Sequence, residues 1–183
     1  MLLDTPICQF GWQAPDFTLP DVDGTPISIT QSYGHNGLLV AFICNHCPYV
    51  KAIIARLVAD AALLREDGIS TLAIMSNDFH NYPDDHPVKM KQFAAQHGFT
   101  FPYLLDETQE VARAYRAICT PDFFGFNRAG KLQYRGQLDD ANMKDASQRQ
   151  ADLLNAMRAI AKTGQGPAQQ TPSMGCSIKW KTA

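Results

Sequence analysis

Apolar runs and helically spaced apolar positions alternate along the first half of the chain. Residues 38–43 are a continuous apolar run, which is typical of a strand buried on both faces of a sheet. Residues 48–66 place apolar side chains three and four positions apart, as an amphipathic helix does. Residues 69–75 form a second apolar run. The order strand, helix, strand predicts two parallel strands joined by a right-handed crossover.

Shorter elements follow in the second half. Helices are predicted over residues 88–97, 107–115 and 147–162, and a brief strand over residues 103–105. Turn signals predict one hairpin at residues 15–30, around an Asp-Gly pair, and another at residues 123–134, around Asn-Arg-Ala-Gly. Helices interspersed among these strands predict an α/β sandwich with a mixed central sheet and an N-terminal β-hairpin extension.

The length of 183 residues suits one domain, because domains cluster around ~100–200 residues. Residues 164–172 are rich in Gly, Pro and Gln and contain no apolar pattern, which is typical of a linker. We therefore expect a domain over residues 1–163, followed by a linker and C-terminal tail over residues 164–183.

Composition and charge exclude several classes of protein. Hydrophobic residues make up 45% of the chain and charged residues 19%, so wholesale disorder is excluded. Sixteen Lys and Arg against eighteen Asp and Glu give a net charge of −2, which indicates neither a nucleic-acid nor a membrane partner. The N-terminus lacks the pattern of a secretory signal, and no apolar run approaches the ~20 residues of a membrane helix. We expect a soluble, cytoplasmic protein.

The cysteines carry the candidate chemistry. They are Cys8, Cys44, Cys47, Cys119 and Cys176. An odd number at irregular spacing in a chain without a signal is not a disulfide scaffold. The roles that remain for these cysteines are catalysis, redox switching and metal binding.

The Cys44-Asn45-His46-Cys47-Pro48 motif lies where the first predicted strand passes into the first long helix. A Cys-x-x-Cys beside such a pattern indicates redox chemistry. Free N–H groups and the helix dipole stabilise a thiolate at a helix N-terminus and lower its pKa. Pro48 suits the first helical turn, and a protonated His46 would make the pair more oxidising.

Two alternatives remain open for this motif. One is a pair of inert, buried cysteines, although the polar residues between them argue against that. The other is a metal site. Zinc usually takes a second such pair, which the chain lacks, but Cys44, Cys47, Cys119 and a histidine could converge on copper or zinc.

The second motif is Cys119-Thr120-Pro121. The order strand, Cys-x-x-Cys, helix, strand, Thr-Pro, hairpin and closing helix resembles the thioredoxin fold. In that fold a cis-proline faces the Cys-x-x-Cys and lines the substrate groove. The resemblance implies a cis Pro121 and a Thr120 backbone that is offered to a docked substrate strand. It also places Cys119 near the pair, as a third redox partner, a metal ligand or a buried small apolar residue.

The opening sequence APDFTLP at residues 14–20 resembles the start of peroxiredoxin-like (AhpC/TSA) redoxins, and an insertion at residues 77–101 suits that branch. The resemblance covers roughly residues 12–163. The sequences CNHCPYVK, CTPDFF and GCSIKW together are similar to a peroxiredoxin-like subgroup with a CNHCP motif. The resemblance therefore implies thiol chemistry at Cys44 and Cys47, supported by His46 and Pro48.

Peroxidase chemistry fits this resemblance incompletely. The peroxiredoxin motif Pro-x-x-x-Thr-x-x-Cys, aligned on Cys47, places Cys44 at the Thr position and Val40 at the Pro position. The family's peroxide-binding arginine would fall near Pro121, where the chain has none. Arg135 is a candidate to replace it, but we expect a surface cation there.

Disulfide chemistry fits better. The thioredoxin resemblance implies that Cys44 attacks and Cys47 resolves the mixed disulfide. Thioredoxins also keep a buried acid on the preceding strand, and residues 38–43 contain none. His46 or water would then have to accept the proton.

The tail holds a candidate resolving cysteine, Cys176, which could reach Cys47 as in peroxiredoxins with a C-terminal resolving cysteine. Ile178 and Trp180 would anchor the tail, on the body or on a partner subunit; an idle thiol is the expected alternative. His80 and His86 are expected to be solvated loop residues, and Cys8 receives no role.

We therefore expect a thiol–disulfide oxidoreductase with an antioxidant or redox-maintenance role and without a cofactor. The alternatives are a thiol peroxidase with Cys47 peroxidatic and Cys44 or Cys176 resolving, a copper- or zinc-binding protein, and a redox-inactive interaction module. Expected partners are a protein or small-molecule disulfide or a peroxide as substrate, and a reductant such as thioredoxin or glutathione. A second copy of the chain in a homodimer is an open alternative to a monomer.

Overall fold

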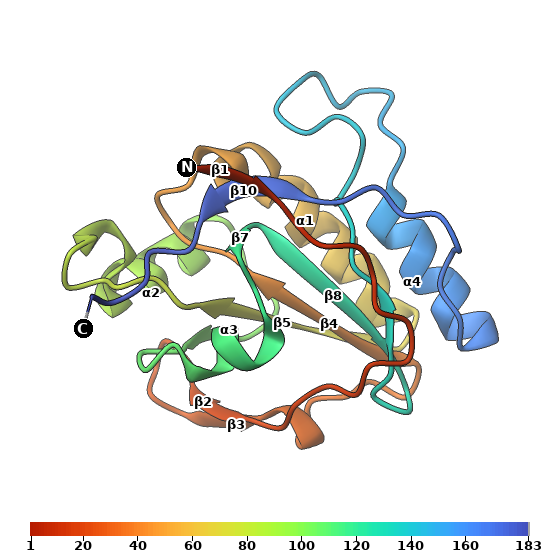
Figure 1. Ribbon diagram of the computed structural model, residues 1–183, viewed down its shortest axis with the longest axis horizontal. Coiled ribbons are helices and arrows are strands. Elements are labelled where there is room, and N and C mark those ends of the chain that lie inside the picture. Colours follow the sequence, from red (N-terminus) through yellow and green to blue (C-terminus); the bar gives the residue numbers. More distant parts are fainter. Residues whose placement is uncertain (183) are drawn as a thin grey trace.

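A computed structural model describes residues 1–182 of the chain (Figure 1). The strands are β1 (Leu2–Asp4), β2 (Thr18–Pro20), β3 (Pro26–Ser28), β4 (Gly37–Phe42), β5 (Ile69–Met75), β6 (Tyr103–Leu105), β7 (Cys119–Thr120), β8 (Asp122–Asn127), β9 (Leu132–Tyr134) and β10 (Met174–Ser177). The α-helices are α1 (Pro48–Glu66), α2 (Pro87–Gln96), α3 (Glu110–Tyr115) and α4 (Asp152–Thr163), with short 3-10 helices at Ile29–Gln31 and Pro83–Asp85.

The central sheet is mixed, as the sequence predicts. Strand β8 runs antiparallel to both β4 and β9, whereas β5 and β6 are parallel. The N–H of Ile43 donates to the Ile74 carbonyl at 3.0 Å and so joins the end of β4 to β5. The hairpins predicted at residues 15–30 and 123–134 are present as β2–β3 and β8–β9.

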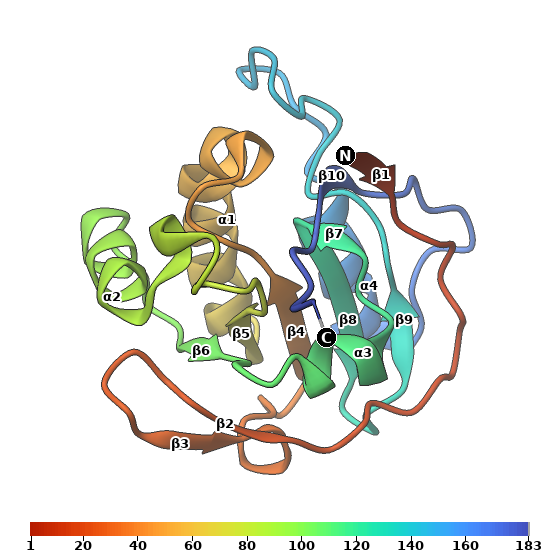
Figure 2. The same cartoon turned by 60° about the vertical axis from the view of Figure 1, so that its left-hand side comes forward.

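Both faces of the sheet are buried, which explains the continuous apolar run at residues 38–43. Alternate side chains of β4 point to opposite faces. Leu39 and Ala41 pack in a core with α1, α2 and α4, whereas Leu38 and Val40 pack in a second core with α3 and the N-terminal segment. The turned view shows α1 and α4 on one side of β4 and β8, and α3 on the other (Figure 2). The observed layers are those of a thioredoxin-like α/β sandwich.

A small second sheet brings the two ends of the chain together. Strand β10 pairs antiparallel with β1 on one side and with β7 on the other. In Figure 1 the blue β10 lies beside the red β1, above β7. The division at residues 163 and 164 stays a prediction, but residues 174–177 after it take part in this sheet.

Two helices begin later than their apolar spacing predicts. Helix α4 starts at Asp152 because the preceding loop satisfies its own backbone: the N–H of Gln150 donates to Asp140 Oδ1 and that of Ser147 to Asp145 Oδ1. Helix α3 starts after Gln109, a buried residue whose φ of 64° is left-handed.

Within residues 1–182, none of the helices has both the length and the apolar character that crossing a bilayer would take.

Candidate active site

The Cys-x-x-Cys motif lies at the N-terminus of α1, as predicted. Cys47 is the N-cap residue and Pro48 occupies the first helical turn, where a missing N–H leaves no bond unmade. Both sulfur-bearing residues are buried: Cys44 is 1% exposed and Cys47 is 0% exposed. They belong to the same hydrophobic core as apolar side chains of β4, α1 and α4, and water has little access to either residue.

Thr120 contacts both cysteines. Cys44 Sγ lies 3.4 Å from Thr120 Oγ1, and the Cys47 thiol donates to the Thr120 carbonyl oxygen at 3.2 Å. The peptide bond between Thr120 and Pro121 is cis, as the resemblance implies. The strand β7 and the N-terminus of α1 therefore meet at one point, with both sulfurs between them.

The two thiols differ strongly in acidity. The pKa of Cys47 lies far below that of an ordinary thiol. The largest cause is a hydrogen bond with the neighbouring Cys44 thiol. The backbone N–H of Val50 in the first turn of α1, together with the N–H and thiol of Cys176, lowers the pKa further, and these effects outweigh burial. The Cys47 sulfur, burial and the charge of Asp85 raise the pKa of Cys44 well above its ordinary value. In the dithiol form the Cys47 thiol donates to Thr120, and when the pair loses one proton the negative charge is on Cys47 rather than Cys44.

His46 is bound to a carboxylate that the sequence did not single out. Its Nδ1 lies 2.6 Å from Asp85 Oδ2, and Asp85 is 0% exposed. The hydrogen bond that His46 donates to Asp85 raises the pKa of His46, although burial opposes the shift. Asp85 also accepts from the Asn45 N–H at 2.8 Å. The buried acid that residues 38–43 lack thus comes from a different segment and acts on His46.

The sequence contained a weak signal for Asp85. The loop after β5 is rich in polar residues, and loops that follow neighbouring strands can meet at one edge of a sheet. His80 and His86 in this loop are exposed, as expected. Asp85, directly before His86, points inwards instead, and nothing in the sequence distinguishes it from the exposed Asp84.

A metal site was the alternative use of these donors. Ligand atoms of Cys44, His46 and Asp85 all lie within 4.8 Å of one another. Both oxygens of Asp85 already accept hydrogen bonds, from Asn45 N–H, His46 Nδ1 and Asn77 Nδ2. The carboxylate is satisfied by these donors, so this arrangement favours a positioning role for Asp85 over a ligand role.

Cys119 lies next to the site but points elsewhere. It is 0% exposed, and its thiol donates to the Pro121 carbonyl at 3.6 Å. Burial raises the pKa of this thiol strongly. Of the three roles considered for Cys119, the geometry favours a buried small residue.

Cys176 lies on β10, directly opposite Thr120 in the strand register. It is partly exposed and packs against the core that contains Cys44 and Cys47. Burial and the Cys47 sulfur raise its pKa. Ile178, which is 3% exposed, and Trp180, whose ring lies 4.4 Å from the Arg113 guanidinium carbon, anchor the tail on the body.

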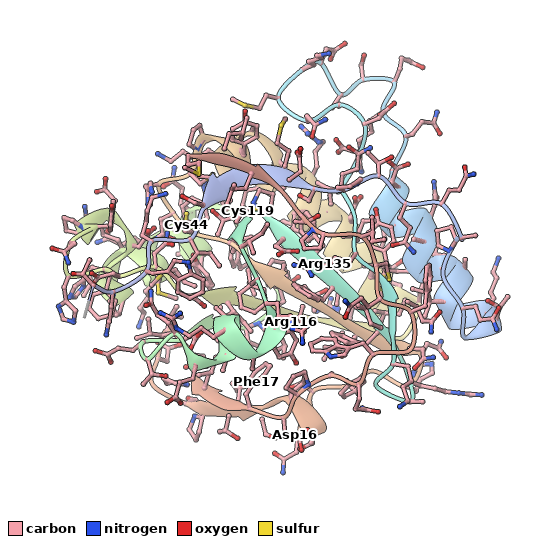
Figure 3. All side chains as sticks on the ribbon, in the orientation of Figure 1. Asp16, Phe17, Cys44, Arg116, Cys119 and Arg135 are labelled. Carbon is pink, nitrogen blue, oxygen red and sulfur yellow. The ribbon has the colours of Figure 1, made fainter. Side chains whose placement is uncertain are left out.

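The expectation that Arg135 is a surface cation is wrong. Arg135 is 6% exposed, and its guanidinium donates to both oxygens of Asp122, at 3.2 and 2.8 Å, and to the Arg116 carbonyl at 2.9 Å. Asp122 needs this partner because it is fully buried. In Figure 3, Arg135 and Arg116 lie well away from Cys44. Arg135 therefore does not replace the peroxide-binding arginine at the cysteine pair.

Comparison with known proteins finds that the chain is similar in sequence to thiol-disulfide oxidoreductases and to peroxiredoxins. The AhpC/TSA family model matches residues 10–135. The thiol-disulfide oxidoreductase ResA of Bacillus thuringiensis is 24% identical over 131 residues, 68% of this chain and 67% of that protein. The peroxiredoxin Bcp of Escherichia coli K12 is 30% identical over 112 residues, 61% of this chain and 67% of that protein.

Solved structures support the fold. An uncharacterised conserved protein from Geobacillus kaustophilus is 42% identical, with a TM-score of 0.93 over 100% of this chain and 98% of that chain. The thioredoxin domain of a thiol-disulfide oxidoreductase from Bacteroides vulgatus is 17% identical, with a TM-score of 0.64 over 83% of this chain and 97% of that chain. At that identity the likeness concerns the fold alone.

Proposed function

The chain belongs to the AhpC/TSA family and is a thiol oxidoreductase, and we propose that it cycles Cys44 and Cys47 between dithiol and disulfide to exchange disulfides. The observation that carries the proposal is the convergence of both sulfurs on Thr120 at the N-terminus of α1. A Cys-x-x-Cys pair in this position has one stabilised thiolate and a second thiol within reach of it.

The opposite pKa shifts of the two cysteines give them different roles in the exchange reaction. Cys47, with its lowered pKa, is the thiolate that attacks a disulfide sulfur or departs from one. Cys44, with its raised pKa, is the thiol that closes the intramolecular disulfide after losing its proton. This assignment reverses the order that the thioredoxin resemblance implies, in which Cys44 attacks.

The test replaces Cys44 and Cys47 singly by Ser and measures turnover of a disulfide substrate. Both variants should lose turnover. Cys119→Ser is the matched control, because Cys119 is equally buried but hydrogen-bonds to Pro121 instead of the pair. Unchanged turnover in both pair variants would rule out the cycle.

A thiol peroxidase is the second candidate, and the thiolate at Cys47 favours it. Cys44 or Cys176 would then resolve a Cys47 sulfenate. The engagement of Arg135 with Asp122 argues against fast peroxide reduction. Mixing reduced protein with limiting hydrogen peroxide tests this candidate: fast thiol loss, together with a Cys47 sulfenate trapped in the Cys44→Ser, Cys176→Ser double variant, would favour it.

The proposal also covers the cellular location, role, reductant and assembly of the enzyme. We place it in the cytoplasm, in a redox-maintenance or antioxidant role, with thioredoxin or glutathione as reductant, and with either a monomer or a homodimer as its assembly. The odd number and irregular spacing of the cysteines, which are not those of a disulfide scaffold, support a reducing compartment. Cell fractionation, reductant dependence of turnover and light scattering test the location, donor and assembly in turn.

A further inference from the structure

Strand β10 occupies the place where a substrate strand would dock. The thioredoxin resemblance offers the Thr120 backbone, next to the cis-proline, to such a strand. Here that edge is paired in antiparallel register with the protein's own tail, Cys176 opposite Thr120 and Ser177 opposite Cys119. Strand β1 covers the other edge of β10. An extended polypeptide cannot pair with Thr120 while the tail is in place.

Several contacts fit the tail closely to this edge. A Cβ added at Gly175 would lie 2.0 Å from the Thr120 carbonyl oxygen, so only glycine allows this approach. The Ser173 hydroxyl donates to the Pro121 carbonyl at 2.9 Å, and the N–H of Ile178 donates to the Ile118 carbonyl at 3.0 Å. Bonds on both sides of Cys176 therefore hold its position.

This placement puts a third sulfur beside the pair. The Thr120 carbonyl accepts from the Cys47 thiol, and Cys176 is the residue opposite Thr120 across the ladder. Cys44 and Cys47 are 1% and 0% exposed, whereas Cys176 is partly exposed. Of the three cysteines, Cys176 is the one that an external molecule can reach.

We propose that Cys176 is the thiol at which the buried Cys44–Cys47 pair exchanges with external disulfides, and that these substrates are small molecules rather than extended polypeptides. The inference rests on the proposed disulfide-exchange function and adds its point of entry and its substrate class.

The electron flow can be written for an external disulfide R–S–S–R. Cys176, which is partly exposed, loses its proton to solvent while its sulfur attacks R–S–S–R, which releases one R–S⁻ and leaves Cys176–S–S–R. The Cys47 thiolate then attacks Cys176 Sγ, and the second R–S⁻ leaves. Cys44 attacks Cys47 Sγ and passes its proton to the departing Cys176 sulfur. The net result is one Cys44–Cys47 disulfide, two R–S⁻, one proton released to solvent and a regenerated Cys176 thiol.

The contacts agree with this order. The Cys176 thiol and N–H both hydrogen-bond to the Cys47 sulfur, so a mixed disulfide on Cys176 forms beside the thiolate that attacks it. The reverse path oxidises two external thiols to a disulfide and uses the same groups. Cys47 then departs from the disulfide, and a thiol with a low pKa is a good leaving group.

The test follows the reaction of fully reduced protein with one equivalent of 5,5′-dithiobis(2-nitrobenzoate), a small disulfide whose released thiolate absorbs at visible wavelengths. All variants carry Cys8→Ser, because Cys8 is also partly exposed. We expect Cys176→Ser to release the first thiolate at least tenfold more slowly than the parent. Ser177→Ala, on the same strand, should react at the parent rate. A parent rate in both Cys176→Ser and Cys176→Ala would overturn the proposal.

Trapping supplies a second readout. In Cys47→Ser the mixed disulfide cannot move inwards, so mass mapping should find the probe on Cys176; a probe on Cys44 would overturn the proposal. Mass mapping of the fully oxidised parent distinguishes a failure of the proposed function from a failure of the entry point. Absence of a Cys44–Cys47 disulfide there would defeat the proposed function itself, whereas its presence with a parent rate in Cys176→Ser would defeat only the entry point.

Discussion

His46 Nδ1 lies 2.6 Å from Asp85 Oδ2, and this pair ties the Cys-x-x-Cys loop to the short helix Pro83–Asp85. The Asn45 N–H and the Asn45 side chain add bonds to Asp85 Oδ1 and the Asp84 carbonyl, at 2.8 and 3.0 Å. The loop between the two cysteines is therefore held by a segment 40 residues away in sequence. Its geometry depends on a carboxylate that lies outside the motif.

Replacing Asp85 by Asn should lower the pKa of His46, because the hydrogen bond and charge of Asp85 are what raise it. In the native protein this pair adds stability below the ordinary His pKa of 6.5, and the gain is lost as pH rises through the raised value. The substitution should remove that pH dependence. Histidine NMR titration and urea unfolding at several pH values measure both effects.

Asp84→Asn is the control for Asp85→Asn. Asp84 is exposed and pairs with Lys89 on the surface, where solvent screens the interaction. It should leave the His46 titration close to that of the wild type. Equal effects of the two substitutions would contradict the role given to Asp85.

Cys44→Ala should raise the pKa of Cys47, because the Cys44 thiol is the largest cause of its lowering. Cys44→Ser keeps a donor at the same place and should raise the pKa less. The ultraviolet absorbance of the thiolate, followed against pH, reports the titration. A Cys47 pKa that stays equally low in the Ala and Ser variants would show that the helix N-terminus and Cys176 account for it without Cys44.

Gly175→Ala should loosen the tail, because the new Cβ would overlap the Thr120 carbonyl oxygen. Overpacking of this kind costs about 1–3 kcal/mol. We expect faster hydrogen exchange in β10 and faster alkylation of Cys44 and Cys47. Ser177→Ala adds no atom to the ladder and serves as the control. Unchanged exchange in Gly175→Ala would mean that β10 accommodates the methyl group by a small shift.

Arg135→Met should destabilise the fold by about 3–5 kcal/mol, because it leaves the fully buried Asp122 without its partner. Adding Asp122→Asn should recover part of the loss. Arg128→Met, at an exposed position in the β8–β9 turn, is the control and should cost under about 0.5 kcal/mol. Urea unfolding gives the free energies.

The peroxide reaction of the Arg135 variant gives an independent check. Measured where the variant remains folded, its rate of thiol loss should match that of the wild type, since the guanidinium donates to Asp122 and Arg116 instead of the cysteine pair. A rate that drops by orders of magnitude would restore Arg135 as a peroxide-binding residue.

The sequence by itself determined the features that arise from short-range patterns. The apolar run at residues 38–43 predicted a strand buried on both faces, and the helical spacing after Pro48 predicted α1 to its last residue. The Cys-x-x-Cys motif at that junction, together with the Thr-Pro motif, predicted a thioredoxin-like fold with a cis Pro121, and the opening at residues 14–20 predicted the family.

Only the tertiary structure decided what depends on contacts between distant segments. The charge balance of the cysteine pair depends on Cys176 and Asp85, which reach it from the tail and from the loop after β5. Arg135 is buried because Asp122 is buried with it, and a one-dimensional pattern cannot distinguish such a pair from two surface charges. Acidity depends on distance and burial, and sequence spacing gives neither between segments far apart in the chain.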